Sequence, residues 1–149
     1  MGDYAACIGT TGSDTVLIVV VNGVTVRIPP TGIFVRQKGI RVVDIPDGMS
    51  HTLLVGEKHV PNGKKLDPVY DCNMYDGHNT PCSTRSAGMG FPLAQSISDD
   101  RVVFGGRHPG ICMFAFADGS VRPVRTSVDE FTLGLLSHRH DGLPVPADY

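Results

Sequence analysis

The chain has 149 residues, a length that suits one folded domain with its own core and leaves no room for a second full domain. Charged residues make up 19% and the formal net charge is -2, so the chain lacks the basic excess that binding to nucleic acid requires. Eighteen Gly, eleven Pro and 41% hydrophobic residues describe a turn-rich folded domain and exclude a disordered one.

The first strong structural signal lies between residues 16 and 28. Val16–Val21 and Val24–Ile28 are rich in β-branched residues and flank Asn22-Gly23, which tolerates the positive φ angles of a tight turn. This segment therefore predicts a β-hairpin. Val16–Val21 is also the longest apolar run, far short of the roughly 20 residues that span a bilayer. Met1–Cys7 has no export-signal pattern, so none is expected in the chain as written.

Three more strands are expected next. Ile33–Arg36 and Ile40–Ile45 are short apolar runs joined at Gln37-Lys38-Gly39, and Pro46-Asp47-Gly48 is a turn signal that ends the second run. His51–Glu57 predicts a largely buried strand.

A long loop region follows, from about residue 58 to residue 100. Loops of this length in a compact domain are usually functional or held in place by a crosslink or an ion. The centre of the loop is rich in hard oxygen donors of the kind that Ca²⁺ prefers, and the expected ligands are Asp71, Asn73 and Asp76. The spacing departs from an EF-hand loop, because Gly77 stands one place too late. The alternative is a solvated loop closed by a disulfide.

Four cysteines allow three disulfide pairings, and none of their spacings forms a CxxC zinc pair. Cys72 with Cys82 would close a short polar loop and would leave Cys7 for Cys112. The alternative is four buried thiols in a reducing compartment.

The last third of the chain predicts further strands. Arg101–Phe104 is one, and Ile111–Ala117 and Ser120–Arg125 flank Asp118-Gly119 as a second hairpin. The apolar residues of Ile111–Ala117 alternate poorly, which indicates a strand covered on both faces. Asp118 is interpreted as a structural turn residue.

One short helix is expected at the C-terminal end. Ser127-Val-Asp-Glu130 has the form of a capping box, and Gly142 and Pro144 are signals that end the helix. Its apolar face should contain Val128, Phe131 and Leu135. Together, the elements predict a single mainly β (α+β) domain over residues 1–149: an antiparallel sheet of hairpins with long irregular loops and this helix.

Several segments resemble the family called domain of unknown function 1559, which is abundant in planctomycetes and described as prepilin-like. They are Gly2–Ala6, Ile45–Lys58, Phe104–Gly110, and His108 followed after nine residues by Asp118-Gly119. This last pattern, the H-X9-DG module, lies within residues 104–125.

Full members of that family resemble type IV pilins and type II secretion pseudopilins, with a prepilin peptide, a long apolar helix and a β-rich head. The resemblance implies a pseudopilin-head-like fold, an extracytoplasmic or secreted location, and a calcium ion in a loop, as pseudopilin heads often hold. The chain lacks the prepilin peptide and the helix. Filament assembly is therefore not expected of this chain alone.

Several side chains are candidates for chemistry. His108 has the residue type of a general base or a ligand, but its place before a strand favours a turn anchor whose ring bonds a backbone group. Asp99-Asp100 is interpreted as a polar turn. His138-Arg-His140-Asp141 either chelates a transition metal or forms a cationic helix end. No nucleophile motif is present, and Cys112 lies in a predicted core strand.

Two functional hypotheses follow. The first is a non-enzymatic, extracytoplasmic head domain that binds a protein, a small molecule or a neighbouring subunit through its loops, with homo-oligomers included. The second is a small metal-dependent hydrolase of esters or lactones, in which calcium or another divalent ion polarises a carbonyl and His108 or His78 transfers the proton.

Overall fold

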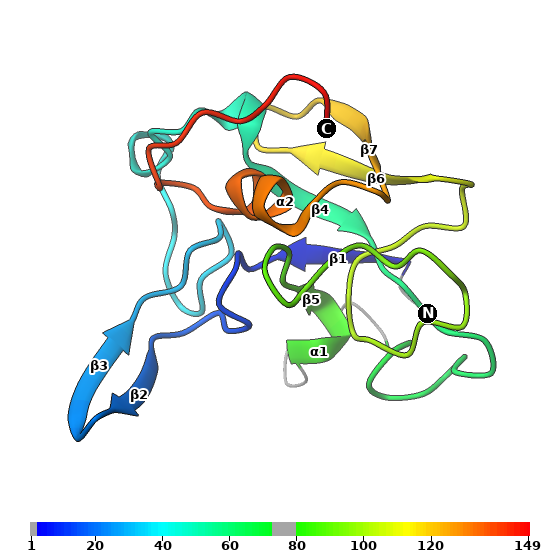
Figure 1. Cartoon of the computed structure of the whole chain (residues 1–149), viewed down its shortest axis with the longest axis horizontal. Coiled ribbons are helices and arrows are strands. Elements are labelled where there is room, and N and C mark those ends of the chain that lie inside the picture. The colour runs from blue at the N-terminus through cyan, green and yellow to red at the C-terminus, as the bar shows by residue number, and fades with distance from the viewer. Residues whose placement is uncertain (1–2, 73–79) are drawn as a thin grey trace.

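The structure is a computed structural model of the chain, and it describes residues 3–72 and 80–149 (Figure 1). A five-stranded sheet forms its centre. In spatial order the strands are β5 (Thr84–Arg85), β1 (Tyr4–Cys7), β4 (Leu53–Glu57), β6 (Ile111–Phe116) and β7 (Val121–Arg125). All neighbours pair antiparallel except β1 and β5, which are parallel. The predicted mainly β fold is confirmed, with one parallel pair added at the edge.

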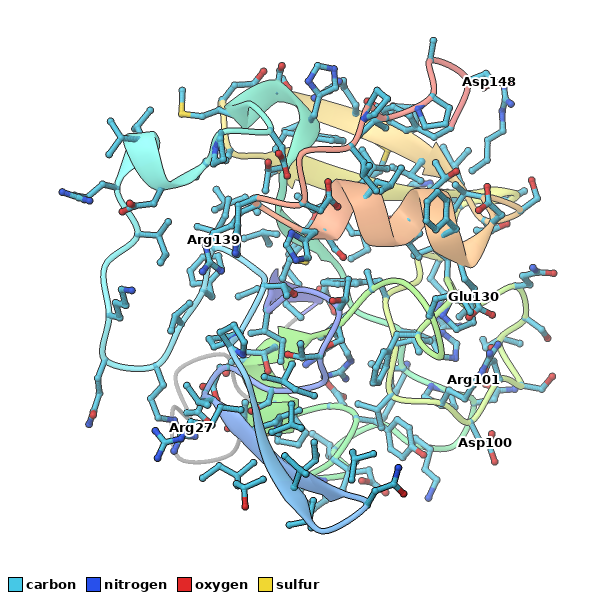
Figure 2. All side chains as sticks on the ribbon, turned by 60° about the vertical axis from the view of Figure 1, so that its left-hand side comes forward. Arg27, Asp100, Arg101, Glu130, Arg139 and Asp148 are labelled. Atoms are coloured by element: carbon cyan, nitrogen blue, oxygen red, sulfur yellow. A yellow bond between two sulfur atoms is a disulfide. The ribbon has the colours of Figure 1, made fainter. Side chains whose placement is uncertain are left out.

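The first predicted hairpin forms a separate two-stranded sheet. It consists of β2 (Leu17–Val21) and β3 (Val24–Ile28), paired antiparallel from Leu17 opposite Ile28 to Val21 opposite Val24. The turn residues Asn22 and Gly23 have φ angles of 50° and 78°, so both adopt the left-handed conformation that the sequence predicts. Figures 1 and 2 show this hairpin projecting from the rest of the chain.

The helical elements are short. They are the 3-10 turns η1 (Val42–Asp44) and η2 (Met49–His51), and the helices α1 (Thr80–Ser83) and α2 (Glu130–Ser137).

The helix α2 confirms the predicted C-terminal helix, but its start differs. The N-cap is Asp129, whose Oδ1 accepts the Thr132 N–H at 2.9 Å, and the predicted capping box at Ser127 is wrong. Ser127 is still part of the turn that follows β7. Glu130 instead accepts the Gly90 N–H at 2.7 Å and ties the long loop to the helix. Phe131 is 60% exposed, so it does not belong to the buried face.

The core lies between α2 and one face of the central sheet (Figure 1). Cys112, Phe114 and Phe116 of β6 are at most 1% exposed, whereas the residues between them are half-buried. The strand therefore has one fully buried face and one half-buried face, so the predicted cover on both faces is complete on one face and partial on the other. The buried members of the core are Ala5, Cys7, Leu53, Ala87, Leu93, Phe104, Cys112, Phe114, Phe116, Val124, Leu133 and Leu136.

Three predicted strands do not form. Ile33–Arg36 contributes only a bridge between Val35 and Lys38, and Ile40–Ile45 becomes η1. In the third, Arg101–Phe104, Phe104 is 1% exposed but makes only an isolated bridge to Lys58. Apolar composition alone predicted these strands, whereas a strand also needs a neighbour with which to pair.

Candidate functional site

The H-X9-DG module forms the β6–β7 hairpin and the turn before it. At the tip, Asp118 Oδ1 accepts the Ser120 N–H at 2.9 Å and the Ser120 hydroxyl at 2.6 Å, and Gly119 has a φ of 84°. The Ser120 hydroxyl is the main reason that the pKa of Asp118 lies below its usual value. The interpretation of Asp118 as a structural turn residue is confirmed.

His108, at the other end of the module, contacts a side chain where the sequence predicted a backbone group. Its Nε2 lies 3.3 Å from Oε1 of Glu57, the last residue of β4. The other carboxylate oxygen of Glu57 accepts the Met113 N–H at 2.8 Å. Glu57 thus joins β4, β6 and the His108 turn, while the His108 side chain stays 56% exposed.

Two glycines allow this close approach. A Cβ on Gly106 would lie 2.1 Å from Glu57 Oε2, and a Cβ on Gly105 would lie 2.7 Å from the Cβ of Ala94. A side chain at Gly106 would displace the Glu57 carboxylate, and one at Gly105 would push the turn away from Ala94. The Gly-Gly pair of the motif therefore has a structural reason.

Two open hollows of about 350 and 300 Å³ are lined in part by this turn. Both are bordered by His59, Gly106 and Arg107. His108 lines the first hollow and Asp71 lines the second, so these two predicted site residues do not line the same hollow.

The base of the long loop is held by a crosslink and a buried cation. The Cys72–Cys82 disulfide is present, with Cα atoms 5.1 Å apart, so the expected short-loop closure is confirmed. Lys58 Nζ donates to the carbonyls of Cys72 and Cys82 at 3.3 and 3.2 Å, and burial lowers the pKa of Lys58. Asp71, 6% exposed, accepts the Leu66 N–H at 3.0 Å.

The remaining predicted residues of this loop, Asn73, Asp76 and His78, lie outside the described residues. The calcium set and the catalytic role of His78 therefore stay predictions.

The second predicted disulfide is wrong, because Cys7 and Cys112 are free buried thiols. Cys7 is in β1 and Cys112 is in β6, with β4 between them. Two strand spacings place them about 10 Å apart, beyond the reach of about 7 Å for a disulfide. Burial raises the pKa of both thiols, that of Cys7 to about 12, so neither is a reactive thiolate.

Arg85 is a buried charge that the sequence analysis missed. It is 2% exposed, and burial lowers its pKa to about 10. Its Nη1 donates to the carbonyls of Pro81 and Thr84, while Nε and Nη2 have no partner within the part of the chain that the structure describes. Nothing in the local pattern Thr84-Arg85 distinguishes it from an exposed strand end.

The two remaining polar segments, around Asp99 and around His138, differ in the residues that they contact. Asp99 pairs with Arg101 at 2.6 Å, and its carbonyl accepts the His59 Nε2–H at 2.7 Å. The Asp99 N–H donates to the Ser96 carbonyl at 3.0 Å, so Asp99 closes a turn that begins at Ser96. His138 and Asp141, in contrast, lie beside Asp47, a residue far away in the sequence.

The β2–β3 hairpin exposes an apolar surface. We define the hairpin surface as Ile18, Val20, Val21, Val24 and Val26, which are 39 to 68% exposed and are distributed over both faces of the ribbon. One face of the ribbon carries only apolar pairs: Leu17 with Ile28, Val19 with Val26, and Val21 with Val24. Across residues 3–72 and 80–149, neither strand pairs with a third, so both strand edges are open.

Residues 21–130 match the model of the family described as protein of unknown function (DUF1559), SBP_bac_10. No curated protein and no solved structure matches the chain. Among the described residues, no helix has both the length and the apolar character needed to cross a membrane.

Proposed function

This chain belongs to the DUF1559 family of proteins of unknown function, and we propose that it is an extracytoplasmic, pseudopilin-like head domain with a non-enzymatic binding role. The observation that carries the binding role is the hairpin surface. An exposed apolar patch costs solubility, and such patches typically mark protein interaction sites.

The geometry of the hairpin favours a protein partner over a small molecule. Val20 and Val24 are 68% and 62% exposed on a ribbon that projects from the body (Figure 2). The open edges of β2 and β3 offer backbone N–H and C=O groups to another strand, and the apolar ladder offers side-chain contacts.

A second copy of the chain fits this surface. Within the hairpin, the only charged side chain is Arg27, on the face that also carries Ile18 and Val20. The opposite face carries no charged residue, so the same face of two copies can pack together without repulsion between like charges. A two-fold symmetric contact of this kind is self-complementary. The binding role therefore includes self-association through β2–β3.

Sedimentation velocity over a range of concentrations tests this role. Wild type should self-associate, and Val24→Lys should shift the equilibrium toward monomer, because burying an ammonium in an apolar contact is unfavourable. Val121→Lys is the matched control, since Val121 is 64% exposed on β7. A wild type that remains monomeric at all concentrations, or two variants with equal effects, would contradict self-association.

The extracytoplasmic location rests on the Cys72–Cys82 disulfide, since structural disulfides persist in oxidising compartments. Fractionation of producing cells with thiol labelling tests it. We expect the chain outside the cytoplasm with these two cysteines unlabelled. Recovery in the cytoplasm with four free thiols would contradict it.

The metal-dependent hydrolase remains the alternative, favoured by one observation. The Glu57 carboxylate lies 3.3 Å from Nε2 of the exposed His108 ring, an arrangement in which a carboxylate orients an imidazole for proton transfer. Purified protein should be assayed on ester and lactone panels with and without Ca²⁺. Turnover that chelator removes and His108→Gln abolishes would establish the hydrolase and overturn the non-enzymatic role.

A further inference from the structure

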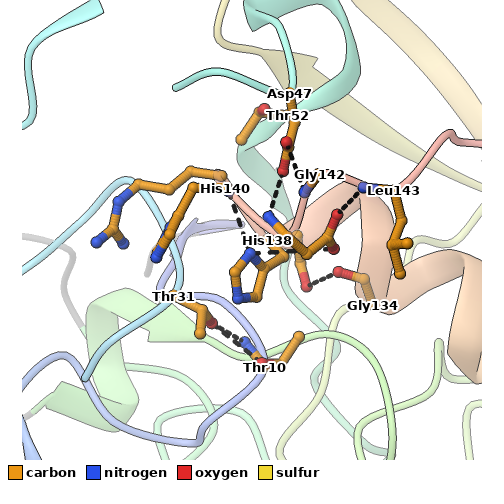
Figure 3. A network of polar contacts seen from close by, with 12 residues as sticks. Thr10, Thr31, Asp47, Thr52, Gly134, His138, His140, Gly142 and Leu143 are labelled. Atoms are coloured by element: carbon orange, nitrogen blue, oxygen red, sulfur yellow. Dashed lines mark hydrogen bonds and ion pairs between the residues drawn. The ribbon is translucent and has the colours of Figure 1, made fainter. Parts of the chain in front are cut away.

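A group of potential metal ligands lies at the C-terminal end of α2, apart from the His108 turn. Asp47, His138 and Asp141 each place one ligand atom within 4.8 Å of the others (Figure 3). Asp47 follows η1, whereas His138 and Asp141 follow α2. In Figure 1 the end of α2 and the start of β6 lie on opposite sides of the molecule, so this cluster is separate from the hollows beside His108.

Backbone contacts hold the three side chains in place. The two carboxylate oxygens of Asp47 accept the N–H groups of Asp141 at 2.7 Å and Gly142 at 2.9 Å. Asp141 Oδ1 accepts the Leu143 N–H at 2.9 Å, and its Oδ2 lies 3.9 Å from His138 Nδ1. Each carboxylate oxygen has more than one lone pair, so these bonds leave capacity for an ion.

The segment that carries His138 and Asp141 is anchored on its other side as well. Arg139, 9% exposed, donates from Nη1 to the carbonyls of Pro30 at 2.7 Å and Gly32 at 2.6 Å. An ion would therefore meet ligands whose main chain is already fixed, which reduces the entropy cost of binding.

The His138 ring is suited to act as a ligand. Its side chain and that of Asp141 are each 19% exposed, so an ion can reach them while their surroundings stay partly dehydrated. Nδ1 accepts the His140 N–H at 3.1 Å, so an ion at Nδ1 would replace this hydrogen bond.

From this arrangement we infer that Asp47, His138 and Asp141 bind one divalent transition-metal ion, with zinc as the ion that fits them. Zn²⁺ takes His nitrogen and Asp oxygen atoms as ligands and is usually four-coordinate, so these three side chains would leave a fourth position for water. Ca²⁺ is disfavoured, because it takes six to eight oxygen ligands and this group supplies a nitrogen and few oxygens. The inference is independent of the binding role proposed for the hairpin.

Calorimetric titration of the full, tag-free chain after chelator treatment tests the site. Zn²⁺ should bind at one ion per chain, raise the melting temperature, and resist competition by Ca²⁺. Loss of a residue that only hydrogen-bonds a metal ligand weakens metal affinity roughly 10- to 100-fold. Removal of a ligand itself should weaken Zn²⁺ affinity by at least this factor in each of three variants: Asp47→Asn, His138→Gln and Asp141→Asn.

Matched controls separate ligands from nearby groups of the same type. Asp44→Asn changes a neighbouring carboxylate that pairs with Arg41, and His108→Gln changes an exposed imidazole on the other side of the molecule. Both should keep wild-type affinity. Circular dichroism of each metal-free variant checks that the variant folds. If Asp47→Asn unfolds, His138→Gln still tests the site, because it leaves the hydrogen bonds from the Asp47 carboxylate to the backbone in place. Absence of saturable Zn²⁺ binding by wild type, or wild-type affinity in folded His138→Gln or Asp141→Asn, would overturn the inference.

Discussion

The β6–β7 hairpin lies in the core of the molecule, whereas the β2–β3 hairpin stands outside it. Cys112, Phe114 and Phe116 of β6 are at most 1% exposed, but Val20 and Val24 of the other hairpin are more than 60% exposed. Both hairpins have an Xaa-Gly turn between β-rich runs. Both segments form antiparallel hairpins, although the turns differ, because Asn22 and Gly23 both have a positive φ whereas at the second turn Gly119 does and Asp118 does not. Contacts with distant parts of the chain decide which hairpin is buried.

The partners of each hairpin explain the difference. β6 pairs with β4, and its inner face meets Leu133 and Leu136 of α2 in the core. β2 and β3 pair only with each other in the described structure. At one edge of the central sheet, Pro123 in β7 has no N–H to offer a further strand. The β2–β3 hairpin has no third strand beside it in the described structure, and its apolar side chains stay exposed.

Truncation of the buried Phe116 side chain should have the largest effect on the free energy of unfolding. Phe116 is 0% exposed, with the Arg122 guanidinium 3.6 Å from its ring centroid. Phe116→Ala leaves a cavity and should lower the free energy of unfolding by about 3–5 kcal/mol. Urea denaturation measures this change. A loss below about 1 kcal/mol would mean that β6 is not a core strand.

Loss of the disulfide should rank second. Its cysteines are 10 residues apart, and opening so short a loop should lower the free energy of unfolding by about 2–3 kcal/mol. Thermal unfolding of Cys72→Ser/Cys82→Ser compares it with wild type. Reductant should destabilise wild type and leave the double variant unchanged, because Cys7 and Cys112 are already free. Equal sensitivity of both proteins to reductant would contradict this assignment.

The same Val→Ala substitution, made once in each hairpin, compares their contributions to the free energy of unfolding. Val124 of β7 is 0% exposed, and Val20 of β2 is 68% exposed. Val124→Ala should cost about 2 kcal/mol, since it removes buried methyl groups. Val20→Ala should change the stability of the monomer by less than about 0.5 kcal/mol. Similar losses in dilute urea titrations would show that β2–β3 is part of the core.

The helix cap should give the smallest effect. Asp129→Ala removes the acceptor of the Thr132 N–H and should cost about 1 kcal/mol. Ser127→Ala is the control, and it should be nearly neutral because Ser127 does not cap α2. A larger loss for Ser127→Ala would restore the capping box that the sequence predicted.

Local patterns predicted part of this structure and could not predict the rest. The turns at Asn22-Gly23 and Asp118-Gly119 were predictable because neighbouring residues determine them. The strand β1 was missed, since Tyr4–Cys7 is short and is defined by pairing with β4 and β5. The Cys7–Cys112 pairing failed for a related reason, because strand order is a long-range property.

The candidate sites follow the same rule. The sequence identified His138 and Asp141 as potential ligands, but Asp47 is 94 residues from Asp141 and no local spacing connects them. His108 was identified by its motif, whereas its partner Glu57 belongs to a different strand. Residues that act together across elements are visible only once the chain is folded.

Native-state hydrogen exchange tests the difference between the hairpins most directly. Amides of β6 should exchange only through global unfolding, whereas amides of β2 and β3 in the monomer should exchange through local opening, at a free energy several kcal/mol lower. Equal protection of both hairpins in the monomer would contradict the account, because it would place β2–β3 in the same cooperative unit as the core.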